Sequence, residues 1–220
     1  MERRELIARL ASEIRRVRAR HPVRVAIDGV EAAGKTTLAD ELVAPLERGG
    51  ASVIRSSIDG FHHPRALRHR RGATSPEGYY ADSFDGKQLV GALLEPLGPG
   101  GSRRYRRAVF DYRLDAPVEA PLEEARADAI LLFDGVFLMR PELRERWDLS
   151  IFVRVDFGVA LERAERRDLA LFGGPSEVRR RYEQRYIPAQ RRYLAESLPE
   201  RLASIAVDNN DPLQPLIEFG

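Results

Sequence analysis

The chain has 220 residues, 43% of them hydrophobic and 32% charged, which is typical of a globular protein with one sizeable core. Its 36 basic and 34 acidic residues leave a net charge of +2, an excess too small to predict a nucleic-acid partner. Cysteine is absent, which excludes disulfides and thiol catalysis, and no leader-like or membrane-length apolar run occurs. We therefore expect a cytoplasmic protein that makes no membrane contact.

The first predicted element is an amphipathic helix over residues 3–19, whose apolar side chains recur at helical spacing on one face. A proline at position 22 ends this helix, and the apolar run at 23–27 predicts a short buried strand. A second helix is predicted from about residue 37 to Arg48, where two glycines follow and stop it.

Between that strand and helix, residues 29–36 read Gly-Val-Glu-Ala-Ala-Gly-Lys-Thr, the G-x-x-x-x-G-K-T pattern of a phosphate-binding loop. Such a loop aims backbone N–H groups and a helix N-terminus at an anion. Lys35 would reach the outer phosphates, and the Thr36 hydroxyl would bind Mg²⁺. The predicted nucleotide contacts are Gly29, Ala32, Ala33, Gly34, Lys35, Thr36 and Thr37.

A second strand is predicted at 51–56, and Asp59 follows it directly. Residues just past the carboxyl end of a parallel strand line the ligand crevice, so Asp59 is a candidate general base for phosphoryl transfer. The alternative is an Asp-Gly pair that only forms a turn. His62 is a candidate acceptor contact, because two adjacent histidines without an acidic cluster disfavour a metal site. Residues 65–84 are predicted to form an irregular, arginine-rich loop on the acceptor side.

The middle of the chain predicts a helix at 85–94 and a small hairpin insertion at 103–120. A near-continuous apolar run at 129–134 then predicts a buried strand that ends in Asp134. An acid at that point suits a Walker-B ligand that holds Mg²⁺ together with Thr36, although a simple strand-end cap is the alternative.

The last third predicts a strand at 149–155 and a helix at 157–169 that carries Arg163 and Arg167. A glycine break follows, so residues 168–176 are a candidate lid whose arginines neutralise the transferring phosphoryl group. A solvated arginine face is an equally open alternative. A long helix from Ser176, with a kink expected at Pro188, and a strand at 203–207 complete the chain. Alternating strands and helices predict one α/β domain over residues 1–220, with a mainly parallel sheet and helices on both faces.

Over residues 23–212 the chain resembles the uridine kinase-like group of P-loop kinases, which includes phosphoribulokinase and pantothenate kinase. The resemblance rests on I-D-G-x-x-x-x-G-K-T-T, on S-I-D-G-F-H at 57–62 and on L-F-D-G-V-F at 132–137. It also rests on residues 163–168 before the lid and on Y-I-P at 186–188. It implies a three-layer P-loop NTPase sandwich, ATP and Mg²⁺, Asp59 and Lys35 as catalytic residues, and nucleotide contacts from Arg163 and Arg167. The acceptor contacts it implies are Phe61, His62, Tyr79, Asp82, Phe110 and Tyr112.

Three positions depart from that family pattern. Tyr79 stands where uridine kinases have a ribose-binding acid, Asp115 replaces a histidine after the hairpin strand, and residues 169–174 replace an arginine-rich lid segment. The departures fall on the acceptor pocket and the lid, whereas the ATP half is intact.

The sequence thus predicts an ATP-dependent kinase that phosphorylates a small-molecule hydroxyl compound, in the first place a nucleoside such as uridine or cytidine. One alternative is an anionic acceptor, such as a nucleotide, a sugar phosphate or a pantothenate-like acid, held by arginines at 65–71 and 103–107. Another is a non-catalytic nucleotide-dependent regulatory protein. The sequence does not decide between ATP and GTP, or whether the chain forms a homo-oligomer.

Overall fold

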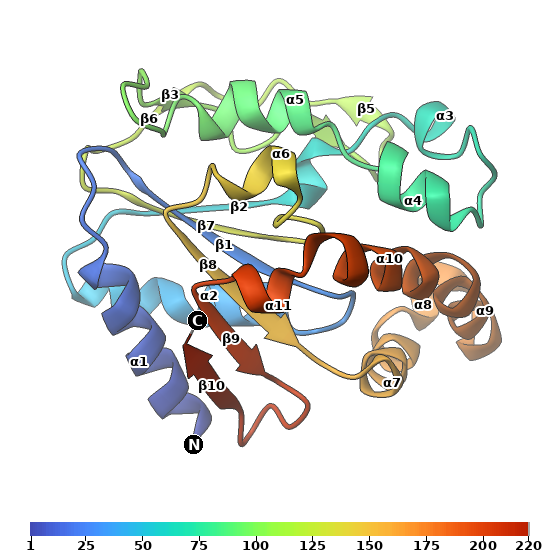
Figure 1. The fold of residues 1–220 in the computed structure, drawn as a ribbon. Helices are drawn as coiled ribbons and strands as arrows, with labels where there is room; N and C mark the ends of the chain where they lie inside the picture. Colours follow the sequence, from blue (N-terminus) through green and yellow to red (C-terminus); the bar gives the residue numbers. More distant parts are fainter. Residues whose placement is uncertain (220) are drawn as a thin grey trace.

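The computed structural model describes residues 1–219, and its centre is a six-stranded sheet with the order β10-β9-β8-β1-β7-β2 (Figure 1). Five strands are parallel, and β10 pairs antiparallel with β9 at one edge. The strands are β1 (Val23–Gly29), β2 (Val53–Ser57), β7 (Ile130–Gly135), β8 (Leu149–Arg154), β9 (Ile205–Asp208) and β10 (Leu216–Phe219). The predicted mainly parallel α/β sheet is confirmed, and β10 was not predicted.

The central strands are buried because helices cover both faces of the sheet. In β7 every residue is buried, and successive side chains point to opposite faces. Val25 and Leu132 pack into a cluster with α1 (Arg3–Arg16) and α2 (Lys35–Arg48). Leu131 and Phe133 pack on the other side with α5 (Gly86–Leu89), the π-helical turn η2 (Val90–Leu94) and α6 (Pro141–Arg144). These layers lie below and above the sheet in Figure 1.

The strand order brings the ends of β1, β2 and β7 to one edge. In β7, Asp134 is in register with Ser57 of β2 and with Ile27 of β1. The order in which strands are added changes direction at β1: β7 and β2 lie on one side of it, and β8 and β9 lie on the other. Ligands of open α/β folds bind at such a switch point, beyond the carboxyl ends of the strands.

The acceptor-side segment is more ordered than its sequence predicts. Beyond the 3₁₀ turn η1 (Ile58–Phe61), residues 65–84 form two short helices, α3 (Arg65–Arg68) and α4 (Pro76–Asp82). The Ser75 side chain accepts a hydrogen bond from the Gly78 amide, which caps α4. The predicted hairpin consists of β4 (Phe110–Asp111) and β5 (Ala116–Pro117), and a second pair, β3 (Arg104–Tyr105) with β6 (Glu123–Glu124), lies outside it.

The C-terminal third forms a run of helices before β9. Its elements are α7 (Phe157–Arg167), α8 (Leu169–Phe172), α9 (Pro175–Arg181), η3 (Tyr182–Tyr186), α10 (Ile187–Ser197) and α11 (Pro199–Leu202). Where a kink was expected, the helix changes from α to π geometry in η3, and Pro188 lies in the first turn of α10 directly after it. Among residues 1–219, no helix has both the length and the apolar content needed to cross a membrane.

Candidate active site

The loop between β1 and α2 has the backbone of an anion cradle. Gly29 lies so close to β8 that an added Cβ would come 2.4 Å from the Val153 carbonyl oxygen. Gly34 is left-handed, with φ of 91°, and begins α2. These two positions need glycine, because a side chain would clash at the first and strain the backbone at the second. The loop therefore opens directly onto the N-terminus of a 14-residue helix.

Lys35 is a buried lysine that faces the loop. Its Nζ donates to the Val30 carbonyl oxygen at 2.6 Å, and within residues 1–219 it makes no ion pair with a carboxylate. A buried ammonium without a directly bonded carboxylate is costly, so its position suits an anion that arrives as ligand. The phosphate of a nucleotide is the anion that the loop backbone also favours.

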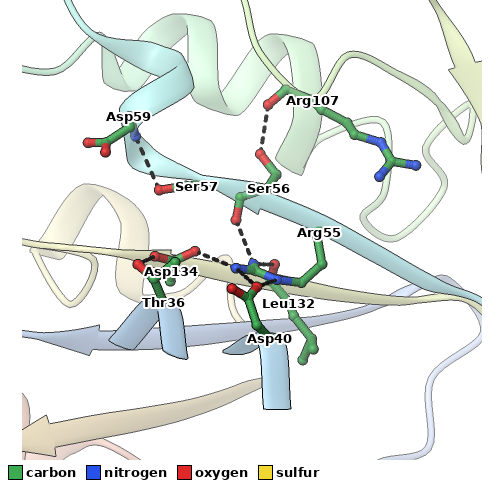
Figure 2. A network of polar contacts seen from close by, with 9 residues as sticks. All are labelled: Thr36, Asp40, Arg55, Ser56, Ser57, Asp59, Arg107, Leu132 and Asp134. Carbon is green, nitrogen blue, oxygen red and sulfur yellow. Dashed lines mark hydrogen bonds and ion pairs between the residues drawn. The ribbon is translucent and has the colours of Figure 1, made fainter. Parts of the chain in front are cut away.

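Thr36 and Asp134 form the candidate magnesium site. The Thr36 hydroxyl donates to Asp134 Oδ2 at 2.6 Å, and Arg55 Nη2 donates to Asp134 Oδ1 at 3.0 Å (Figure 2). Arg55 also bonds to the Leu132 carbonyl oxygen and to the carboxylate of Asp40. A hydroxyl and a carboxylate are the hard oxygen donors that Mg²⁺ prefers, so this pair fits the ion. Arg55 was not predicted from the sequence as part of the site.

Asp59 lies across the cleft from the loop, in η1, and Figure 2 shows it just beyond the end of β2, the strand next to that of Asp134. Both carboxylates line a cleft of about 360 Å³ together with Lys35. The Asp59 carboxylate is reached by solvent through the cleft mouth. The surrounding cleft walls desolvate it in part, and this desolvation is the main cause that raises the pKa of Asp59 to about 6. The negative charge of Glu31 adds to the shift.

Aromatic side chains form one wall of the same cleft. Phe84 and Tyr112 line it, and the His62 ring lies 4.6 Å from the Phe84 ring and 4.8 Å from the Tyr112 ring. The Nδ1 atom of His62 is 3.0 Å from the carbonyl oxygen of Asp59. Burial lowers the pKa of His62 to about 4, so this imidazole is neutral at pH 7. Phe84 was not predicted as an acceptor contact.

The other predicted acceptor residues do not line the cleft. Phe61 is fully buried beside Phe133, and Phe110 is buried where β4 pairs with β5. Asp82 is buried and accepts hydrogen bonds from Arg70 and Arg71, at 3.0 and 2.8 Å. The 3₁₀ turn at η1 directs Phe61 into the core although Asp59, two residues earlier, faces the cleft.

Tyr79 is also buried, but its hydroxyl donates a hydrogen bond to the carboxylate of Glu31 in the phosphate loop. Its ring packs edge-on against Phe137 and Tyr186. The departure from the family pattern at position 79 therefore lies at the contact between α4 and the phosphate loop. Glu31 lines the cleft and was not singled out from the sequence.

The two predicted lid arginines have different surroundings. Arg167 lines the cleft and forms a two-pronged ion pair with Asp168, at 2.7 and 2.9 Å. Arg163 instead donates to the carbonyl oxygens of Asn209 and Asn210, at 2.7 and 3.0 Å. Of the two, only Arg167 lines the cleft.

Asn209 supports the phosphate loop from behind. Its side-chain amide donates to the Ala33 carbonyl oxygen at 2.7 Å, and its oxygen accepts from Arg3 of α1 at 3.0 Å. Asn209 is 3% exposed, so this contact is shielded from water. The residue follows β9 directly, which is the same strand-end position that identified Asp59 and Asp134. Its position after a predicted strand was the sequence signal from which Asn209 could have been found.

The strand order, the loop with its buried lysine and the Thr36–Asp134 pair define a P-loop protein of the α/β class. No family model matches the chain. It is 30% identical over 172 residues to uridine-cytidine kinase B of Dictyostelium discoideum, and the matched region covers 77% of this chain and 68% of that protein. It is 28% identical over 180 residues to a pantothenate kinase of Rhodopseudomonas palustris (strain BisB5), with 76% of this chain and 56% of that protein covered. The chain belongs to the uridine kinase-like family of P-loop kinases.

Solved structures share the fold. One, described as a possible uridine kinase from Bacillus stearothermophilus, has a TM-score of 0.75 and 23% identity and covers 94% of this chain and 99% of its own. Another, D-glycerate 3-kinase from Cryptococcus neoformans, has a TM-score of 0.60 and 12% identity and covers 97% of each chain. At these identities the likeness establishes the fold alone.

Proposed function

We propose that this protein is an ATP-dependent kinase that transfers the γ-phosphoryl group to a hydroxyl of a nucleoside such as uridine or cytidine. The observation that carries the proposal is the position of Asp59. A carboxylate with a pKa of about 6 shares one cleft with Lys35 and with the Thr36–Asp134 pair. Phosphoryl transfer to a hydroxyl needs a carboxylate beside the acceptor that can take the hydroxyl proton.

In the proposed reaction, the loop amides and Lys35 hold the β- and γ-phosphates. Thr36 and Asp134 hold Mg²⁺, which supplies positive charge to the phosphates when bound. Asp59 accepts the proton of the acceptor hydroxyl, whose oxygen bonds to the γ-phosphorus. The bond to the β–γ bridging oxygen breaks, and ADP leaves with the electron pair. Arg167 offsets the charge that develops on the transferring group.

The aromatic wall favours a planar acceptor. Phe84 and Tyr112 line the cleft with Asp59, and the neutral His62 ring packs against both of them, with its Nδ1 atom 3.0 Å from the Asp59 carbonyl oxygen. Rings of this kind pack well against a nucleobase, through offset or edge-to-face contacts.

The test is an acceptor screen that measures ADP formation with ATP and Mg²⁺. Uridine and cytidine are compared with other nucleosides and with non-nucleoside alcohols. The Asp59→Asn variant serves as the control for ADP formation that does not depend on the Asp59 carboxylate. We expect uridine or cytidine to stimulate ADP formation at least tenfold. Tight ATP binding with no stimulation by any acceptor would instead support the regulatory-protein hypothesis.

A second candidate function, a kinase for an anionic acceptor, is favoured by the surroundings of Arg185. This arginine is 5% exposed, donates to the Ala73 carbonyl oxygen and, within residues 1–219, forms no ion pair with a carboxylate. Its charge and that of Arg68 both lower the pKa of His69, so the cations are close together. Arg68 forms an ion pair with Asp115 at 3.0 Å, although its buried Nε has no hydrogen-bond partner within residues 1–219. A phosphate or carboxylate on the acceptor would compensate the charge of Arg185.

The two candidates are separated by acceptor pairs that differ in one charged group. Uridine is compared with uridine monophosphate, and each is tested with wild-type and Arg185→Gln protein. A preference for the nucleotide that Arg185→Gln abolishes would support the anionic acceptor. A preference for uridine in both proteins would exclude it.

A further inference from the structure

Glu31 is an acid inside a loop that binds phosphates. It is the third residue of the loop and lines the cleft with Lys35 and Asp59. A carboxylate this close to a triphosphate repels it, and the loop gains nothing for ATP binding from an acid at this position. Its presence therefore calls for a role on the side of the cleft that faces away from the phosphates.

The contacts of Glu31 point to the acceptor side. Its Oε1 accepts a hydrogen bond from the hydroxyl of Tyr79, which α4 supplies from the acceptor-side segment. Within residues 1–219 neither Lys nor Arg forms an ion pair with Glu31, and its Oε2 receives no hydrogen bond. One oxygen is thus fixed by a buried tyrosine, and the other is available to a hydroxyl donor in the cleft.

Glu31 also lies beside the candidate base. Among the charged groups around Asp59, Glu31 has the largest effect on its pKa and raises it, and Asp134 raises it further. Lys35 and Arg167 act in the opposite direction. Because Glu31 and Asp59 also line the same cleft, an acceptor whose reactive hydroxyl lies at Asp59 can present a neighbouring group to Glu31.

We propose that Glu31 is a specificity residue that accepts a hydrogen bond from a second hydroxyl of the acceptor, close to the one that is phosphorylated. The acceptor class is then a polyhydroxyl compound such as the ribose of a nucleoside, and Tyr79 is the positioning residue that orients the carboxylate. This inference rests on the proposed function. A site built to bond a hydroxyl discriminates strongly against an analogue that lacks it, because the buried polar group is left unpaired.

The test compares Glu31→Ala, Glu31→Gln and Tyr79→Phe with wild-type protein on uridine and on its 2′-deoxy and 3′-deoxy counterparts. Wild-type protein is expected to prefer uridine over one of the two by roughly 10- to 100-fold in kcat/KM, the range for one hydrogen bond to a charged group. Glu31→Ala should abolish that preference by lowering kcat/KM for uridine and for the deoxynucleoside that keeps the bonded hydroxyl, but not for the one that lacks it. Glu31→Gln keeps an acceptor oxygen and Tyr79→Phe keeps the carboxylate, so both should retain an intermediate preference.

Two further measurements separate this role from a structural one. Removal of the Glu31 charge lowers the pKa of Asp59, so the acidic limb of the pH–rate profile should move to lower pH in Glu31→Ala and Glu31→Gln but not in Tyr79→Phe. Binding of a fluorescent ATP analogue should be unchanged or tighter in the same two variants. Glu47→Ala, which removes an exposed acid of α2, is the matched control and should change neither quantity.

Three other outcomes would overturn the inference about Glu31. Equal losses on uridine and on both deoxynucleosides in Glu31→Ala would overturn the inference, since the role of Glu31 would be structural. Wild-type activity on uridine without discrimination against either deoxynucleoside would overturn the inference and leave the proposed function intact. The absence of wild-type activity on every nucleoside would overturn the proposed function and this inference with it.

Discussion

The pKa of Asp59 predicts how the reaction depends on pH. A general base works only when ionised, so activity should fall as the pH drops through about 6, the raised pKa of this carboxyl. Asp59 is then roughly 90% ionised at pH 7 and roughly 10% at pH 5, so kcat/KM for the acceptor should fall roughly ninefold between them. An aspartate with its ordinary pKa of 3.8 would remain more than roughly 90% ionised at pH 5 and would give almost no fall.

Asp59→Asn provides the matched perturbation. The amide keeps the size of the side chain but cannot take the proton, so kcat should fall by roughly 10²- to 10⁴-fold while ATP affinity stays nearly constant. Initial rates of ADP formation at saturating ATP and Mg²⁺, from pH 5 to 8 at constant ionic strength, measure both effects. Thermal unfolding at each pH controls for loss of folded protein. A flat wild-type profile, or an Asn variant within a few-fold of wild type, would refute the assignment of Asp59 as base.

Three further predictions concern the supports of the site. Burial raises the pKa of the fully buried Asp28 to about 6, so its charge costs up to about 3 kcal/mol above pH 6 and less as the pH falls toward 3.8; Asp28→Asn should raise Tm roughly three times as much at pH 8 as at pH 4.5, and an equal rise at both would contradict this. Arg55→Gln removes the hydrogen bond that orients the Asp134 carboxylate and should raise several-fold the Mg²⁺ concentration for half-maximal activity, whereas the exposed control Arg126→Gln should not. Asn209→Ala removes a buried hydrogen bond to the phosphate loop and should weaken ATP binding by roughly 5- to 100-fold; unchanged binding in a titration would show that the loop needs no such support.

The sequence predicted the parts of the site whose signal is local. The phosphate loop is a contiguous pattern, and Asp59 and Asp134 each follow an apolar strand, so the parallel sheet alone brings them to one edge. The long β7 run was recognised for the same reason, because a strand buried on both faces is apolar throughout.

Contacts between distant segments could not be predicted in this way. The hydrogen bonds from Arg55 to Asp134 and from Tyr79 to Glu31 span 79 and 48 positions and depend on how the elements pack. The direction of Phe61 was missed because a 3₁₀ turn, and not an extended strand, follows β2. Strand β10 was missed because its four residues lie at an edge and are only partly buried, which weakens the alternating pattern.

The hydrogen bond from Asn209 to Ala33 has a consequence for the order in which the protein matures. Ribosomes make Asn209 176 residues after Ala33, so the nascent chain carries the complete G-x-x-x-x-G-K-T sequence long before its support exists. Strand β9 must also be added beside β8 before Asn209 can reach the loop. A nascent chain that stops before β9 therefore lacks this support of the phosphate loop, and we expect it to bind ATP more weakly than a chain that includes Asn209.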